Sequence, residues 1–356
     1  MAFADLFANL FPALGAPMLA EHRRRYERSD QWNGGVFRNA VPTVLDVGPR
    51  DTFWFMRELM RRNTMRRPSA PLPSVPYRAP LTPEPQVRWF GHSAVLFEEA
   101  GRTVLFDPMF GRSPAPFPFV GPQRYPTQVP LDPLTLPDID VAVLSHDHYD
   151  HLDHGTIALL RPKVRQWVVT LGVARHLVAW GVDADAIVEL DWHESVNAIG
   201  MTFTCLPARH FSGRGLWDRF GSLWASWSVV TPSTRLYFSA DSGYGDHFAE
   251  IGERYGPFDM VLMECGQYHP KWKAIHMLPE ESVLAARDVR AAVAVPIHWA
   301  AFTLALHPWF EPAERFTAAA HDAGLLIATP MLGEVVPVFG PHPREQWWRE
   351  LVPGTL

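Results

Sequence analysis

The sequence predicts a layered α/β fold in which sheets lie between helices. Three observations predict it. Short apolar runs bounded by turns begin at Val87, helical segments follow them in each half of the chain, and no solenoid-type repeat is present. This pattern suits a sandwich of sheets and helices better than an all-parallel, doubly wound sheet.

The strands and helices can be justified in chain order. Strands are expected at Val87–Phe90, Ser93–Glu98 and Thr103–Asp107, with a hairpin turn at Glu99–Gly101. After a proline-rich insertion, Asp140–Ser145 is a continuous apolar run, as expected of a strand buried on both faces. The elements expected next are a helix at Thr156–Leu160, a strand at Gln166–Thr170, a helix at Gly172–Trp180 and a strand at Ile187–Leu190.

The second half of the chain shows the same kind of pattern. The expected strands are Ser195–Ile199, Thr202–Pro207, Ser226–Thr231, Arg235–Ala240, Met260–Glu264, Val293–Pro296, Leu326–Ala328 and Glu334–Val338. The expected helices are Asp246–Gly252, Pro279–Val289 and Pro312–Ala323. Two strands of this half, Ser226–Thr231 and Arg235–Ala240, are expected to form a hairpin.

The composition is that of a globular protein. Its 356 residues are 47% hydrophobic and 20% charged, which is enough to bury a substantial core. A net charge of −6 gives no basic field, so nucleic acid is not expected as a partner. Only two cysteines are present, Cys205 and Cys265, and they lack a paired metal-binding spacing. A reducing, cytoplasmic location is therefore expected.

Three regions are predicted along the chain. Residues 1–85 form a basic, partly helical extension, residues 86–340 form the sheet-rich domain, and residues 341–356 form a tail. Within residues 1–25, apolar side chains at helical spacing precede the basic run Arg23–Arg25. A helix lying on a membrane and a helix packed on its own domain are both consistent with this pattern.

The segment Ser145–His151 carries the strongest chemical signal. His146, His148, Asp150 and His151 follow directly after the predicted strand Asp140–Ser145. Three imidazoles and a carboxylate within six positions, in a turn that leaves a sheet, can converge on metal ions.

Further candidate ligands follow other predicted strands. His210 comes after Thr202–Pro207, Asp241 directly after Arg235–Ala240, and His298 after Val293–Pro296. Because each lies just past the carboxyl end of a strand, one rim of the sheets could present them all.

In this order, the ligand candidates resemble those of the metallo-β-lactamase superfamily. The resemblance implies a four-layer αβ/βα sandwich with the site at one edge. It also implies that His146, His148 and His210 bind one metal, that Asp150, His151 and His298 bind a second, and that Asp241 bridges the two.

A closer resemblance is to N-acyl-phosphatidylethanolamine phospholipase D and its bacterial relatives, over roughly residues 85–325. It rests on Trp89-Phe-Gly-His-Ser93, Leu105-Phe-Asp-Pro-Met-Phe110, Gly121-Pro-Gln-Arg124, His146-Asp-His-Tyr-Asp-His-Leu-Asp153, Leu223-Trp-Ala-Ser-Trp-Ser228, Asp241-Ser-Gly-Tyr244 and Ile297-His-Trp-Ala-Ala-Phe302. The early segment Gly35–Asn39 extends it, whereas Asp147 stands where asparagine is expected. The resemblance implies a phosphodiesterase that acts on N-acyl-phosphatidylethanolamine or a related phospholipid, and a homodimer.

The expected cofactors are two divalent metal ions. Zn²⁺ is the default for histidine and aspartate ligands, and Mn²⁺ or Fe²⁺ would also fit. Two cations would lower the pKa of a bound water and give a hydroxide nucleophile. Asp150 and Asp241 are expected to act in catalysis through the metals. His276, which resembles a histidine near the metals of the phospholipases, is expected to orient phosphate or to protonate the leaving group.

Supporting residues are also predicted. Asp107 and His92 are candidates to hold metal-bound imidazoles through hydrogen bonds. Tyr149, Tyr244 and Gln267 are candidates to contact substrate. A cluster of three tryptophans either packs between layers or lines a groove for acyl chains. The cluster consists of Trp217, Trp224 and Trp227.

Two other functions remain open. A lactonase or sugar-phosphate hydrolase of the same fold would have a small, basic pocket, whereas a lipid enzyme would have an apolar groove. A metal-binding scaffold without turnover would have lost one or more ligands, and the sequence lacks none of those implied.

Overall fold

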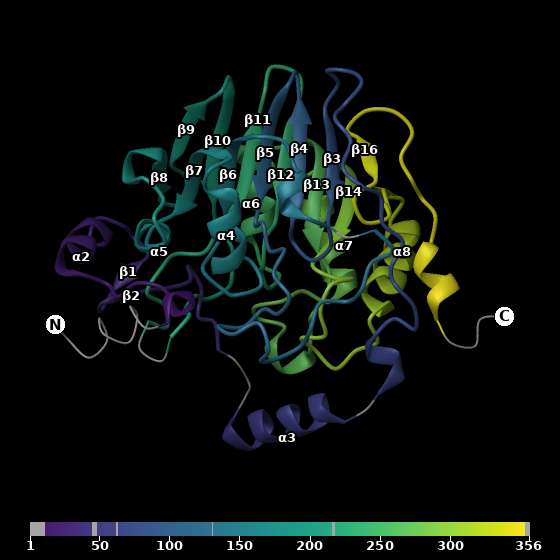
Figure 1. Cartoon of the computed structure of the whole chain (residues 1–356), viewed down its shortest axis with the longest axis horizontal. Coiled ribbons are helices and arrows are strands. Elements are labelled where there is room, and N and C mark those ends of the chain that lie inside the picture. Colours follow the sequence, from purple (N-terminus) through teal and green to yellow (C-terminus); the bar gives the residue numbers. More distant parts are fainter. Residues whose placement is uncertain (1–10, 45–47, 62, 130, 216–217, 353–356) are drawn as a thin grey trace.

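The computed structural model describes residues 11–44, 48–61, 63–129, 131–215 and 218–352. Two seven-stranded sheets pack face to face, and helices cover their outer faces (Figure 1). This is the four-layer αβ/βα sandwich, so the expected fold class is confirmed.

The first sheet is built from the first half of the domain and one late strand. Its strands, in spatial order, are β16 (Val335–Pro337), β3 (Gln86–Trp89), β4 (Val95–Glu99), β5 (Arg102–Phe106), β6 (Ile139–Leu144), β7 (Val164–Thr170) and β8 (Ile187–Leu190). β3, β4 and β5 are antiparallel, whereas β5 to β8 run parallel. Ala100 and Gly101 join β4 to β5 with φ values of 50° and 73°, as a two-residue hairpin requires.

The second sheet is built from the second half of the domain. Its strands, in spatial order, are β15 (Leu326–Ile327), β14 (Ala291–Ile297), β13 (Phe258–Glu264), β12 (Arg235–Phe238), β11 (Ser226–Val230), β10 (Met201–Leu206) and β9 (Ser195–Ala198). β9 to β12 are antiparallel, whereas β12 to β15 run parallel.

The helices lie outside the sheets, where their apolar faces are buried. Apolar residues of α4 (His154–Leu160) and α5 (Ala174–Ala179) pack in a core cluster with the first sheet. The second sheet carries α6 (His247–Arg254), α7 (Pro279–Asp288) and α8 (Glu311–Asp322). The expected strands and helices of the domain are thus present, with ends that differ by a few residues.

The main core lies between the sheets and beneath the second set of helices. Phe106 of β5 stacks on Phe238 of β12 with ring centroids 4.9 Å apart, which joins the two sheets. Trp224 and Trp227 are buried in this core, so they pack between layers and do not line a groove. Trp217 lies outside the described residues.

The predicted C-terminal tail also contributes to the core. The 3₁₀-helix η6 (Trp347–Leu351) places Trp347 and Trp348 against Trp299, each with ring centroids 5.4 Å from it. Side chains from before residue 85 and from after residue 340 pack in the same core as the sheets. This packing does not define domain boundaries, so those at residues 85 and 340 stay predictions.

The N-terminal extension lies along one side of the sandwich and beneath it (Figure 1). Its elements are η1 (Pro12–Leu14), α2 (Ala20–Tyr26), β1 (Trp32–Asn33), β2 (Val36–Phe37), α3 (Pro49–Met60) and η2 (Thr64–Arg66). Tyr26 and Phe37 enter the main core. Of residues 1–25, to which the membrane interpretation applies, residues 1–10 lie outside the described residues. None of the described helices has both the length and the apolar character to cross a membrane.

Candidate metal centre

The candidate ligands gather at one rim because of the direction of the strands. The parallel strands β5 and β6 of one sheet and β12, β13 and β14 of the other end at this rim, and β10 runs in the same direction as β12. Asp107, Ala240 and His298 follow these ends with φ values of 37°, 49° and 68°. Positive φ values in residues with a side chain are uncommon and cluster at functional sites.

One group of ligand candidates, here called the three-histidine set, consists of His146, His148, His210 and Asp241. The Nδ1 atom of His148 lies 3.0 Å from Nε2 of His146 and 3.1 Å from Nε2 of His210. Donor atoms around an ion at a bond length of 2.0–2.1 Å lie about 3.3 Å apart in a tetrahedron, so this spacing suits such an ion. Burial lowers the pKa of all three imidazoles, which keeps them in the neutral form that binds metal.

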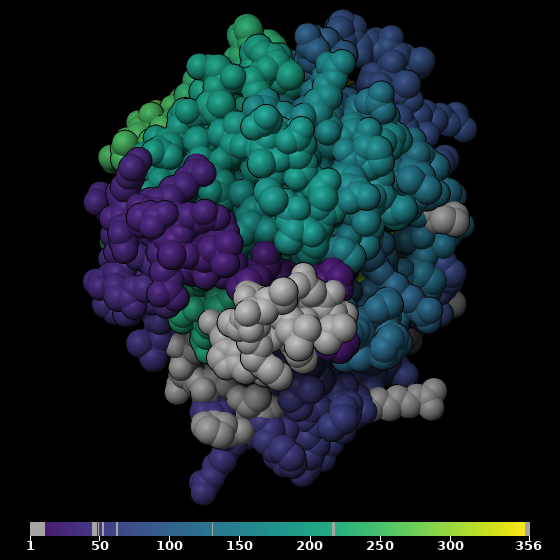
Figure 2. Space-filling model, turned by 60° about the vertical axis from the view of Figure 1, so that its left-hand side comes forward, coloured from purple at the N-terminus to yellow at the C-terminus, as the bar shows by residue number. Residues whose placement is uncertain are grey.

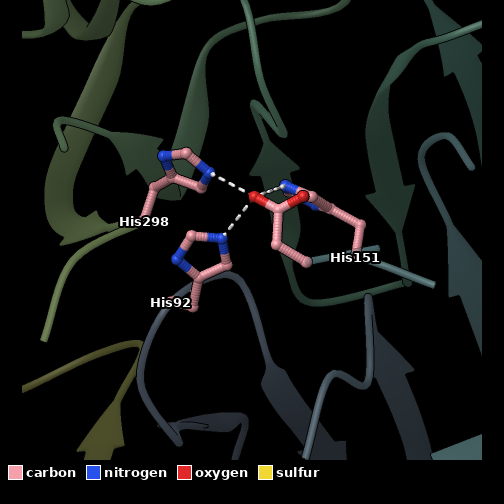
Figure 3. Close-up of side chains that lie close together, drawn as sticks. His92, His151 and His298 are labelled. Atoms are coloured by element: carbon pink, nitrogen blue, oxygen red, sulfur yellow. Dashed lines mark hydrogen bonds and ion pairs between the residues drawn. The ribbon is translucent and has the colours of Figure 1, made fainter. Parts of the chain in front are cut away.

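The second group, here called the two-carboxylate set, consists of Asp150, His151, His298 and Asp241, with His92 beside them. Figure 3 shows the rings of His92, His151 and His298 turned towards one carboxylate oxygen. That oxygen is Oδ2 of Asp150, which lies 2.9 Å from Nε2 of His92 and 3.7 Å from Nε2 of each of the other two.

Asp241 lies between the two sets. Its Oδ2 atom is 3.1 Å from Nε2 of His151 and 3.6 Å from Nε2 of His210, and its Oδ1 atom is 3.0 Å from Nε2 of His298. Burial acts to raise the pKa of Asp241, but His151 and His298 hold it well below its usual range. A buried, ionised carboxylate in this position can offer one oxygen atom to a cation in each set.

The pKa values of the histidines in the two-carboxylate set are shifted in the opposite direction from those in the three-histidine set. Although burial acts to lower it, the carboxylates of Asp241 and Asp150 raise the pKa of His298 to about 10. The same two carboxylates raise the pKa of His151 well above its usual value against the effect of burial. This set therefore attracts positive charge strongly.

Asp107 supports both sets from behind. Its Oδ2 atom lies 2.7 Å from Nδ1 of His151, which leaves Nε2 of that ring to face the site. Ser145 donates its hydroxyl to Asp107 and contacts Nδ1 of His146 at 2.9 Å. Asp107, predicted from the sequence as a supporting residue, thus contacts the imidazole of His151 directly and that of His146 through Ser145.

Backbone carbonyls orient two further ligand candidates. Nδ1 of His210 lies 2.9 Å from the carbonyl oxygen of Ile275, and Nδ1 of His298 lies 3.3 Å from that of Gly266. A proton on each Nδ1 leaves Nε2 as the ring atom that faces the site and would bind a metal ion.

Several buried polar atoms at the rim make ion-pair contacts with one another but no well-aligned hydrogen bond among the described residues. They include Nε2 of His151, Nε2 of His298 and Oδ1 of Asp241. Buried polar groups are normally satisfied, and a cation would satisfy all three. The donor set, nitrogen and oxygen without thiolate, fits two divalent ions.

His276 reaches the same rim from the loop after β13. Its Nδ1 atom lies 3.0 Å from Oε2 of Glu264 and 4.0 Å from Oδ2 of Asp241. Glu264, the last residue of β13, also accepts hydrogen bonds from the backbone of Ser242 and Met277. The sequence interpretation missed Glu264, although a lone carboxylate at the end of a buried apolar strand was a usable signal.

A cleft of about 330 Å³ opens above the two sets. The apolar walls of the cleft consist of Phe55, Phe211, Trp272, Ile275 and Leu304. Gln267 also lines the cleft, but its side-chain amide donates to the carbonyl oxygen of Phe302 and accepts from the backbone N–H of Leu304.

Two of the predicted substrate residues do not line this cleft. The hydroxyl of Tyr149 donates to the carbonyl oxygen of Arg214, and that of Tyr244 donates to Asp288. Each tyrosine flanks a ligand in the sequence, but its side chain points to a different neighbour. The structure adds Phe55 of α3, which the sequence interpretation did not single out.

Comparisons with known proteins identify the family to which this chain is similar. The family described as the beta-lactamase superfamily domain matches residues 102–299. An uncharacterized protein of Mycobacterium tuberculosis is 43% identical over 346 residues, 95% of this chain and 92% of that protein. The N-acyl-phosphatidylethanolamine-hydrolyzing phospholipase D 1 of Caenorhabditis elegans is 38% identical over 242 residues, 64% of this chain and 67% of that protein.

A solved structure shows the same fold. Igni18, a metallo hydrolase from the hyperthermophilic archaeon Ignicoccus hospitalis, has a TM-score of 0.54 and 21% sequence identity, and it covers 71% of this chain and 97% of its own.

The chain belongs to the metallo-β-lactamase superfamily. Within it, the protein is a metal-dependent hydrolase close to the N-acyl-phosphatidylethanolamine-hydrolyzing phospholipases D.

Proposed function

We propose that the protein is a dinuclear metal-dependent phosphodiesterase of phospholipase D type that acts on N-acyl-phosphatidylethanolamine or a related phospholipid. The observation that carries the proposal is the position of Asp241 between the three-histidine set and the two-carboxylate set, at the floor of a cleft with apolar walls.

In this proposal His146, His148 and His210 would hold one ion, Asp150, His151 and His298 would hold the other, and Asp241 would be shared by both. Two divalent ions bound there would supply an activated water and neutralise negative charge on the phosphoryl oxygens. A phosphodiester suits such a site because it is itself an anion. No arginine or lysine is among the described residues that line the cleft, so the metal ions would supply the positive charge that faces it.

His276 has a separate role in the proposal. Its contact with Glu264 fixes the ring, and the ring stacks on that of His298 with centroids 5.3 Å apart. With Nδ1 engaged, Nε2 can hydrogen-bond a phosphoryl oxygen or give a proton to the leaving alkoxide when the phosphorus–oxygen bond breaks.

The surroundings of the cleft favour a lipid over a small, charged substrate. Phe55 of α3 reaches the cleft and contacts Trp272 edge-on, with ring centroids 4.9 Å apart. The same helix exposes 73% of Phe53 and 77% of Met60 to solvent. An exposed apolar helix face beside an apolar cleft suits a substrate that enters from a phospholipid layer.

Metal content and three substrates test the proposal. Elemental analysis of the full chain is expected to give two metal ions per chain. The same protein would be assayed against bis-p-nitrophenyl phosphate, an N-acylated phosphatidylethanolamine in detergent micelles, and a small lactone. Chelator-sensitive cleavage of the first two is the expected result. Turnover of the lactone alone would replace the phosphodiesterase with a lactonase, and absence of all turnover would leave a metal-binding scaffold.

A further inference from the structure

The loop that carries four of the ligand candidates, residues 146–152, is fastened by a buried arginine outside the site. Arg214 is only 5% exposed. Its Nη1 atom donates to the carbonyl oxygens of Asp147 and Leu152, each at 2.6 Å. These two carbonyls lie at either end of the ligand-bearing loop, so one guanidinium group connects both ends.

The other edge of the same guanidinium group holds the N-terminal part of the chain. Nε and Nη2 of Arg214 donate to the carbonyl oxygen of Ala13, at 3.1 and 2.8 Å. Residues 12–16, here called the N-terminal strap, therefore meet the metal-binding loop through one side chain. Figure 2 shows the N-terminal residues, in purple, lying against the surface of the sandwich.

The strap has further attachments of its own. Arg175 donates to the carbonyl oxygen of Ala16, and Trp180 donates to that of Pro12. The backbone N–H of Ala16 donates to Nδ1 of His176 at 2.9 Å, which leaves Nε2 of this ring 3.4 Å from Oδ2 of Asp147. The strap is thus connected to the metal-binding loop along two routes.

Asp147 is the meeting point of the second route. Its carboxylate is fully buried and accepts hydrogen bonds from the backbone N–H of Gly213 at 2.8 Å and the hydroxyl of Ser222 at 2.5 Å. Arg175 lies 3.9 Å from the same carboxylate. The side chain of Asp147 therefore points away from the metal sets and towards the strap.

We propose that Arg214 is a positioning residue for the metal centre and that the N-terminal strap holds it in place. The inference rests on the proposed metal centre, and it assigns the control of how firmly the metals are bound to residues that do not line the cleft. A planar guanidinium group can bond in several directions at once, whereas a lysine ammonium cannot reproduce this fork.

Gly15 offers a second way to disturb the strap. It is buried and has φ = 82°, and a Cβ atom there would lie 2.2 Å from Nδ1 of His176. Gly15→Ala must therefore displace the strap or the His176 ring that holds it. Gly200 is a matched control, because its φ is 81° and an added Cβ would meet nothing within 4 Å. The two substitutions share the backbone strain but not the collision.

The experiment uses the full chain loaded with Zn²⁺ or Co²⁺. Metal release to a chelator would be followed for Arg214→Lys, Gly15→Ala and Gly200→Ala, together with the visible spectrum of the Co²⁺ forms and thermal unfolding of the metal-free forms. Release is expected to be roughly 10–100-fold faster in the first two variants, as for other supporting residues of metal sites. Gly200→Ala is expected to release metal at the wild-type rate.

The failures of the two proposals are distinguishable. If wild-type protein takes up no metal, the proposed metal centre fails and this inference fails with it. If wild-type protein binds two ions and both variants release them at its rate with unchanged Co²⁺ spectra, only this inference is overturned. A lower unfolding temperature without faster release would also overturn it, because it would show a purely structural role. If Arg214→Lys does not fold, Gly15→Ala decides.

Discussion

The two sets of side chains at the rim lie next to each other but differ in charge. The three-histidine set gathers imidazoles whose pKa values are lowered by burial, so it offers neutral nitrogen donors. In the two-carboxylate set, Asp150 and Asp241 raise the pKa values of His151 and His298. Only Asp241 belongs to both.

The difference shows that two sites built from the same residue types can differ in the protonation of their histidines. A cation entering the three-histidine set meets lone pairs that are already free. A cation entering the two-carboxylate set must displace protons that the carboxylates hold on the imidazoles. The two positions are therefore expected to differ in their response to pH and to substitution.

The largest effect is expected from the residue that the two sets share. Asp241→Asn is predicted to lose metal from both sets and to reduce turnover to background, because its carboxylate contacts His151, His210 and His298. Metal analysis and diester hydrolysis would measure it. Asp322→Asn, at an exposed position on α8, is the control. Two bound metals and near-wild-type rates in Asp241→Asn would refute the bridging role.

Substitution of a ligand that belongs to one set only should affect the metal bound in that set and leave the other metal in place. His148→Ala is predicted to abolish turnover and to retain close to one metal per chain, because His148 contacts only the nitrogens of His146 and His210 within the centre. Elemental analysis and far-ultraviolet circular dichroism would check metal content and fold. Wild-type turnover by this variant would contradict the two-metal proposal.

A smaller effect on metal binding is expected from Asp107, which contacts a ligand candidate but is not one itself. Asp107→Asn is predicted to weaken metal binding by about 10–100-fold. The amide would place a donor against Nδ1 of His151 or the hydroxyl of Ser145, both of which now meet the carboxylate. Competition with a chelator would measure the change. Unchanged affinity would mean that Asp107 serves only the turn before Pro108.

The contrast between the sets also predicts a pH dependence. The raised pKa of His298, about 10, means that this imidazole is protonated at pH 7 to 8 before metal enters. Affinity for one metal equivalent should therefore rise with pH up to about 10, and its binding should release protons. The other equivalent should be insensitive above pH 6.5, because the pKa values in the three-histidine set are lowered. Calorimetry in buffers of different ionisation enthalpy would measure both, and equal proton release would contradict the assignment.

The smallest effect lies outside both sets. Replacing Phe53 and Met60 of α3 with serine is predicted to slow cleavage of a phospholipid in vesicles on the order of threefold to tenfold. Cleavage of bis-p-nitrophenyl phosphate should not change, because neither side chain lines the cleft. Leu81→Ser, which alters an exposed apolar residue outside α3, is the control. Equal loss on both substrates would argue against a role in lipid access.

Much of the fold could be predicted because its signals are local. Apolar runs and turns located the strands and helices, and the placement of ligand candidates after strand ends was enough to predict that they share a rim. The partner of β16 was not predictable. This strand follows β15 in the chain, yet it pairs with β3 in the other sheet, and no local pattern indicates such a return.

The orientation of side chains in the loops could not be predicted from the sequence. Tyr149 and Tyr244 flank ligands, but tertiary hydrogen bonds to Arg214 and Asp288 determine where their hydroxyls point. The short hairpin of β1 and β2 was missed although Gly34-Gly35, the two residues of its loop, is a turn signal. The position of α3 over the cleft depends on contacts such as that between Phe55 and Trp272, which are distant in sequence.

The shared position of Asp241 has a consequence for how the protein is made. The ligand candidates extend from residue 146 to residue 298 and come from both sheets. A chain emerging from the ribosome completes the first sheet's ligand loop long before His298 is synthesised. Only when both sheets have docked can the two sets share one carboxylate, so metal uptake is expected to be a late event that locks the halves of the nascent protein together.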